Sequence, residues 1–155
     1  MPAGRVSWAA QTEGAVALVA ATAKTVLNVI AASGKSFKVT EIGVGFDGVT
    51  ASAVPVLVEL CRSTQAGAGT SSAVTLRRCG GDPNITVDST AAKNYSAEPT
   101  VLTPVREYLL TPNGGLMIVP FPLGRELEAV VAQALAIRCT APAGVNVRAY
   151  AEIEE

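Results

Sequence analysis

The segment VNVRAYAEI, residues 145–153, decides the fold class of this chain. Apolar and polar residues alternate along it from end to end. A period of two places successive side chains on opposite faces of a β-strand, so one face meets a core and the other meets solvent. The inward set is Val145, Val147, Ala149, Ala151 and Ile153, and the outward set is Asn146, Arg148, Tyr150 and Glu152.

The rest of the chain carries shorter runs of the same kind, separated by turns rich in Gly, Pro, Asn and Asp. Residues 73–78 fit either a short strand or a helical turn. The runs together predict an all-β fold, an antiparallel β-sandwich or jelly roll of roughly eight to ten short strands. The expected strands cover residues 15–20, 24–30, 37–46, 54–63, 105–110, 116–121, 127–131, 134–140 and 145–153.

A chain of 155 residues fits one domain, and we expect a short N-terminal arm over 1–14 and a β-sandwich over 15–155. The run AVALVAATA, residues 15–23, also resembles the core of a signal peptide. Glu13 and Lys24 flank this run and alternation continues to Ile30, which favours a strand. No run reaches the roughly 18 apolar residues that span a bilayer, so we expect no membrane partner.

Two features of the strand pattern stand out. Gly43 and Gly45 lie inside the expected strand 37–46, where glycine marks a bulge or a close approach of another group to the backbone. Residues 80–104 form a long polar segment with one short strand expected around 85–87. Such a segment is either an interaction loop or a passive connection. Its candidate contact residues are Asn84 and Tyr95.

Composition favours binding to other proteins over binding to nucleic acids. Hydrophobic residues make up 49% of the chain, charged residues 16%, and the net charge is −1. No basic stripe is visible, although neutralising phosphates requires one, so we expect no nucleic-acid partner. Low charge indicates either a protein–protein interface, with the chain as an oligomer, or a large core rich in Ala and Val.

The residues that usually carry catalysis are scarce. The chain has no histidine, the commonest general base and metal ligand. Its cysteines, Cys61, Cys79 and Cys139, are widely spaced and form no metal-binding motif, and Cys61 and Cys139 fit buried reduced thiols better than a disulfide. We therefore expect no cofactor, no metal site and no enzymatic activity.

Several other residues are candidates for an interface. Arg125 and Glu126 lie in an apolar turn, where they either bridge to a neighbouring subunit or form a weak local pair. Arg138 and Arg148 lie on strands and are placed to form similar pairs between neighbouring strands. Trp8 either anchors the N-terminal arm or fills the base of the sandwich. Tyr150, on the outward face of 145–153, completes the set.

Six phrases of the sequence together resemble a known group of proteins. They are AKTVL (23–27), IGVGFDG (42–48), PVLVEL (55–60), AEPT (97–100), PLGRE (122–126) and IRCTAP (137–142). Their order is similar to that in small jelly-roll-like virion proteins of tailed bacteriophages, of the capsid decoration (cement) type. The resemblance covers nearly all of the chain after residue 20. Its motifs are structural phrases, so no functional residue carries over.

The resemblance implies a homotrimer that binds the major capsid protein on the exterior of the virion after synthesis in the host cytoplasm. The alternative is a receptor- or carbohydrate-binding β-module of a tail fibre or spike, since sandwiches often serve that role. Sugar sites usually need exposed aromatic rings and carboxylates, and with one Trp and three Tyr this chain offers few such rings. An enzyme on a β-scaffold is the least favoured hypothesis, because the chain lacks histidine and its carboxylates are scattered.

Overall fold

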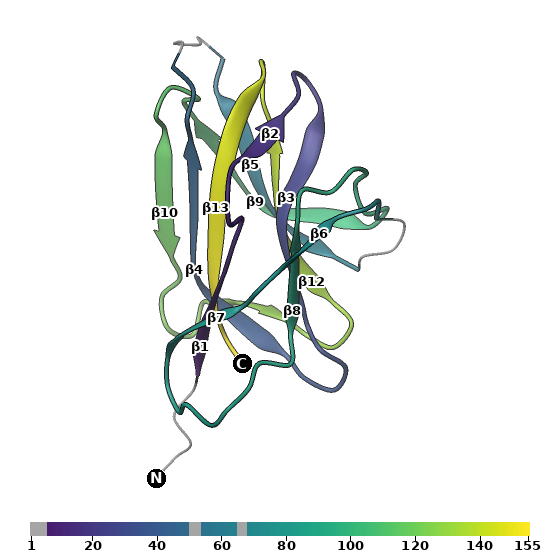
Figure 1. Cartoon of the computed structure of the whole chain (residues 1–155), viewed down its shortest axis with the longest axis vertical. Helices are drawn as coiled ribbons and strands as arrows, with labels where there is room; N and C mark the ends of the chain where they lie inside the picture. The colour runs from purple at the N-terminus through teal and green to yellow at the C-terminus, as the bar shows by residue number, and fades with distance from the viewer. Residues whose placement is uncertain (1–5, 50–53, 65–67) are drawn as a thin grey trace.

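The structure is a computed structural model that describes residues 6–49, 54–64 and 68–155. Thirteen β-strands in two sheets make up this part of the chain, with no helix among the described residues (Figure 1). The prediction of an antiparallel β-sandwich is confirmed. The strand count is higher than expected because short strands of three to five residues lie in segments without clear alternation.

One sheet, here called sheet A, has seven strands, and its order is β10-β4-β13-β1-β7 with β11 beside β4 and β2 beside β13. Its long central strands, β4 and β13, are the two strands with the clearest alternation in sequence. The bounds are β1 (Ser7–Gln11), β2 (Val16–Leu18), β4 (Phe37–Phe46), β7 (Arg77–Gly80), β10 (Leu116–Pro120), β11 (Leu127–Ala129) and β13 (Val145–Glu154).

The other sheet, sheet B, has six strands in the order β6-β8-β3-β12-β5-β9. All the strand pairs described in both sheets are antiparallel. The bounds are β3 (Ala23–Ile30), β5 (Val56–Ser63), β6 (Ser72–Val74), β8 (Thr90–Lys93), β9 (Leu102–Leu110) and β12 (Ala134–Thr140).

The core lies between the two sheets. The predicted inward side chains of β13 are buried from Val147 to Ile153, and the outward ones remain partly or fully exposed. Sheet B contributes β-branched and leucine side chains from its central strands, which pack well on a pleated surface. The largest fully buried contributors to the core cluster include Leu27, Phe37, Ile42, Leu60, Ile137 and Ile153.

Residues 7–11 of the expected arm form β1 within sheet A. Trp8 pairs with Ile153 of β13 and Arg78 of β7. The side chain of Trp8 is buried, and the Arg78 guanidinium lies 5.0 Å from the centre of its ring. Because β1 lies between two strands, this stretch of backbone is part of the sandwich and not an appendage to it.

The undecided segment 73–78 is divided between the sheets. Its first part belongs to β6 of sheet B and its last part to β7 of sheet A, so the chain changes sheets at residues 75 and 76. Leu76 is buried at this crossing. The expected strand at 85–87 does not form, and the strand in this polar segment is β8 instead.

Residues 94–101, called the strap, connect β8 to β9, which are separated in sheet B by β3, β12 and β5. The Glu98 carboxylate accepts hydrogen bonds of 2.6 Å from both the amide and the hydroxyl of Thr25. Tyr95 is buried, and its hydroxyl accepts a hydrogen bond from Asn28. The strap therefore covers polar side chains on the outward face of sheet B, and this part of the long polar segment is packed rather than free.

Register explains why the two strand cysteines stay apart. Ala136 pairs with Cys61 and Cys139 pairs with Val58, so the two thiols point to opposite faces of sheet B. Both are buried and free, as expected. Burial raises the pKa of Cys61 to about 11 and raises that of Cys139 as well. Both thiols are therefore protonated at neutral pH.

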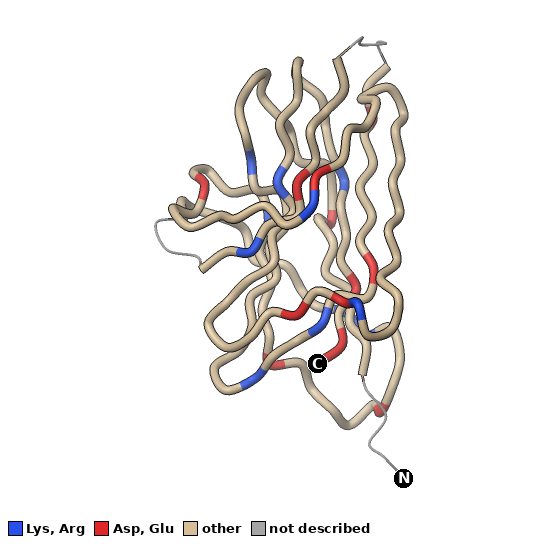
Figure 2. Tube along the Cα trace, turned by 180° about the vertical axis from the view of Figure 1, so that it is seen from behind, with Lys and Arg blue, Asp and Glu red and all other residues tan. Residues whose placement is uncertain are grey.

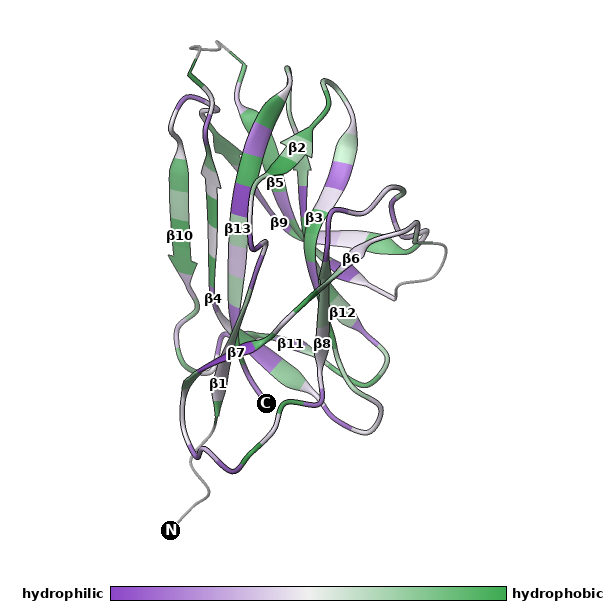
Figure 3. Ribbon diagram, viewed as in Figure 1, coloured by the Kyte–Doolittle hydropathy of each residue, from purple (hydrophilic) through white to green (hydrophobic). Residues whose placement is uncertain are grey.

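The described residues contain no helix long and apolar enough to cross a membrane. Basic and acidic residues are interspersed over the trace, with no continuous basic stripe in the view of Figure 2. Hydrophobic colour extends along most of β10, which is the edge strand of sheet A (Figure 3).

Candidate functional site

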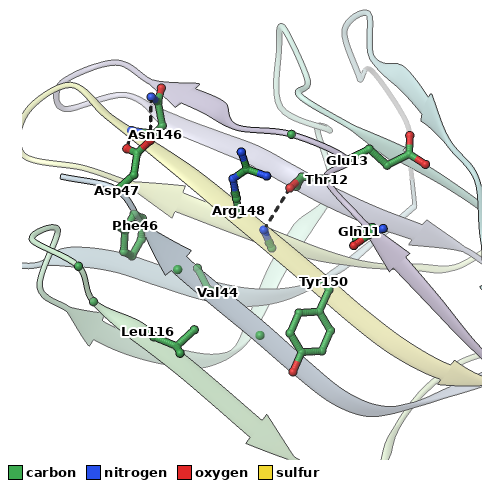
Figure 4. A pocket seen from close by; sticks show the side chains of 16 residues that line it. Gln11, Thr12, Glu13, Val44, Phe46, Asp47, Leu116, Asn146, Arg148 and Tyr150 are labelled. Carbon is green, nitrogen blue, oxygen red and sulfur yellow. Dashed lines mark hydrogen bonds between the residues drawn. The ribbon is translucent and has the colours of Figure 1, made fainter. Parts of the chain in front are cut away.

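A groove of about 560 Å³ lies on the outward face of sheet A (Figure 4). This volume is within the range of small-molecule sites. Strands β4 and β13 form the floor of the groove. One rim is formed by β10 and the turn before it, and the other by the end of β1 and the residues that follow it. We call it the sheet A groove.

Two glycines of β4 make the groove hollow. Gly43 pairs with Tyr150 and Gly45 pairs with Arg148, so the side chains of β13 lie beside bare backbone. A Cβ atom at Gly43 would lie 2.0 Å from Cε1 of Tyr150. The sequence prediction of a close approach at this glycine is therefore confirmed, and the approaching group is the tyrosine ring.

Tyr150 lies across β4, and Figure 4 shows its ring face-on from the groove. Its hydroxyl donates a hydrogen bond of 2.5 Å to Oε1 of Glu41. Burial, this hydrogen bond and the charges of Glu41 and Glu152 raise the pKa of Tyr150 to about 12. The backbone of Gly43 on one side and the carboxylate at its end hold the ring in one orientation.

Arg148 extends from β13 on the same face as Tyr150. Within the described residues its guanidinium makes no hydrogen bond or ion pair, whereas Arg77 and Arg138 each pair with a carboxylate. The residue is exposed. It therefore presents an unneutralised cation at the edge of a largely apolar hollow.

The carboxylates near Arg148 already have partners. Asp47 accepts hydrogen bonds from the backbone and side-chain nitrogens of Asn146, at 3.2 and 3.1 Å. Oε1 of Glu13 lies 3.5 Å from Nη2 of Arg77. The groove therefore combines engaged acceptors with one free cation and one fixed aromatic ring.

A second surface feature is the pair of open sheet edges, here called the edge flank. It consists of β9, the edge of sheet B, and β10, the edge of sheet A, which the turn 111–115 joins. Large apolar side chains are exposed on both strands. They are Val105 at 37%, Leu109 at 68%, Leu116 at 68% and Ile118 at 53%.

Three of the candidate interface residues make contacts within the chain's own fold. Trp8 is buried in the core between the sheets, in agreement with the alternative that it fills the sandwich, and Tyr95 is buried beneath the strap, so neither side chain is exposed to a partner. Arg138 forms a two-pronged ion pair with Glu59, with nitrogen–oxygen distances of 2.7 and 2.8 Å. This pair joins β12 and β5 within one chain, in agreement with the sequence hypothesis of a pair between neighbouring strands.

The remaining candidates lie on the surface at separate places. Arg125 and Glu126 lie in the turn after β10, where Glu126 accepts a hydrogen bond from the Gly124 amide. Asn84 lies in the turn after β7 and bonds to Asp82. Only Arg148 and Tyr150 come together, in the sheet A groove.

The described residues contain no group of three or more Cys, Asp or Glu side chains placed to hold a metal ion. Neither known protein families, nor curated proteins, nor solved structures gave a match to this chain.

Sequence reasoning missed part of the groove. Asp47 bonds to Asn146, 99 residues further along the chain. Gln11 lines the groove because β1 pairs with β13 and places Gln11 opposite Tyr150. Both contacts depend on how segments far apart in the chain are aligned in the sheet, and a local sequence pattern does not predict that alignment.

Proposed function

We propose that this protein is a structural component of a bacteriophage virion that decorates and stabilises the capsid by binding the major capsid protein as a homotrimer. The sequence resemblance motivates the partner, and the edge flank is the observation that carries the proposal. Soluble monomers rarely expose large apolar side chains along the edges of both of their sheets. In an assembled trimer on a capsid, such side chains are covered.

The chemistry of the edge flank favours side-chain packing over strand addition. Pro104 lies in β9 and Pro120 in β10, and proline cannot donate a hydrogen bond to a neighbouring strand. These residues limit open-ended pairing, while the apolar side chains beside them remain available. A closed trimer suits this combination better than a fibre does.

The polar contacts on the outward face of sheet B suit a scaffold role. The ion pair between Arg138 and Glu59 and the bonds from Glu98 to Thr25 fix polar groups that would otherwise be free for chemistry. A decoration protein needs a rigid body and many weak contacts, and repetition over a shell multiplies the effect of each contact.

Co-sedimentation with capsids of the phage whose genome encodes the chain tests the proposal. We expect the purified protein to sediment alone as a trimer, to bind capsids at a saturating ratio and to raise their melting temperature. A monomer that neither co-sediments with capsids nor alters their melting would contradict it. Capsids of an unrelated tailed phage serve as the control for non-specific adsorption.

A further inference from the structure

We propose that the sheet A groove binds an acidic saccharide, with a sugar ring stacked on Tyr150 and its carboxylate or sulfate held by Arg148. This site is separate from the edge flank, and the proposal does not depend on the capsid function. It rests on four observations from the described residues: the fixed ring, the free cation, the engaged carboxylates and the paired strands of the floor.

The fixed ring supplies a platform. A pyranose has one face made mainly of C–H groups, and these are attracted to the electron-rich face of an aromatic ring. Tyr150 is held before any ligand arrives, by the backbone of Gly43 beneath it and by its hydrogen bond to Glu41. A ring that is already ordered loses little conformational entropy on binding.

The free cation supplies charge selectivity. Arg148 pairs with Gly45 across the strands and projects from the same face of β13 as Tyr150, two residues away. A guanidinium binds carboxylates and sulfates through two parallel hydrogen bonds. Asp47 is hydrogen-bonded to Asn146 and Glu13 is paired with Arg77, and within the described residues no carboxylate forms an ion pair with Arg148.

The same surroundings disfavour other ligand classes. Strand addition by a peptide is blocked, because β4 and β13 at the floor are each paired on both sides. A polyphosphate chain would place repeated charges beside Asp47 and Glu13, with only one cation to balance them. A saccharide with one acidic group per ring matches one arginine beside one aromatic platform.

Titration of the ¹⁵N-labelled protein, followed by NMR, tests the proposal with matched probe pairs. The pairs are sialyllactose against lactose and methyl glucuronide against methyl glucoside, so that each acidic probe carries a single carboxylate. We expect an acidic probe to shift the amide resonances of Gly43, Gly45 and Tyr150, and its neutral counterpart to bind at least about tenfold more weakly, as loss of a charge-assisted bond implies.

Four variants test which residues are responsible for binding of the acidic probe. Tyr150→Ala removes the platform and should weaken binding at least about tenfold, whereas Tyr150→Phe keeps the ring and should remain within about threefold. Arg148→Gln should abolish the preference for the acidic probe. Arg125→Gln removes an exposed arginine from a turn outside the groove and should leave binding unchanged.

The spectra of the variants also report folding, since dispersed amide resonances show that the sandwich is intact. The proposal is wrong if no acidic probe shifts the groove resonances at millimolar concentration. It is equally wrong if a probe binds but neither Tyr150→Ala nor Arg148→Gln weakens it in a folded variant.

Discussion

Tyr150 shows how one side chain depends on its surroundings. Because its pKa is raised to about 12, the phenol stays protonated in the folded chain at pH values where an unfolded chain ionises it, near 10. Protonation therefore favours the folded state, and the contribution is complete below about pH 10. It is lost as the pH rises from about 10 to about 12.

We predict that the tyrosinate absorbance of the wild-type protein minus that of Tyr150→Phe titrates with a midpoint near pH 12. The subtraction removes the signals of Tyr95 and Tyr108. Tyr150→Phe should also lose less stability between pH 10 and 12 than the wild type does, as measured by urea unfolding. A difference midpoint near 10 would show that Glu41 and burial do not act on this phenol.

Between elements, the ion pair of Arg138 and Glu59 joins β12 to β5 in the middle of sheet B. The Glu59 side chain is only 6% exposed, so its charge depends on the guanidinium for compensation. We predict that Arg138→Met lowers the free energy of unfolding by about 3 kcal/mol, because it leaves a buried carboxylate unpaired. Urea unfolding measures the loss.

Two controls separate the ion pair from packing. The double variant Arg138→Met/Glu59→Leu should recover most of the loss, since it removes both charges and keeps apolar volume. Arg148→Met removes an exposed arginine that has no partner among the described residues and should change stability by less than about 0.5 kcal/mol. A double variant as unstable as Arg138→Met alone would contradict the interpretation.

For the whole molecule, the edge flank makes a prediction about association. We predict that Ile118→Lys in β10 shifts the sedimentation of the protein from trimer toward monomer, because a charge cannot be buried unpaired at an interface. Val19→Lys is the matched control, since Val19 is also exposed and apolar but lies in the turn after β2. Equal effects of the two variants would exclude a specific role for the edge flank.

The sequence predicted the class of fold because its long strands alternate clearly. β4, β12 and β13 were expected within one residue of their observed bounds. β1, β7 and β8 were not, because Ser7–Gln11 and Thr90–Lys93 consist mainly of small or polar residues, and their pairing partners are distant in the chain. Local patterns also could not predict that residues 72–80 are divided between the two sheets.

Only part of the groove could be predicted from the sequence. Gly43 was recognised as a place of close approach, and Tyr150 as an outward residue, but nothing local indicated that the two meet. No local pattern showed whether Trp8 and Tyr95 are buried, because each is flanked by small or polar residues. Sheet pairing buries Trp8, and the strap buries Tyr95.

The position of β13 between β4 and β1 has a consequence for how the chain is made. During synthesis, β1 and β4 leave the ribosome long before residues 145–154, which must be inserted between them. Until then, each exposes an apolar face and an unpaired edge to solvent. The central strands of sheet A therefore pair last, and chaperones should capture the nascent chain most often before residues 145–154 have emerged from the ribosome.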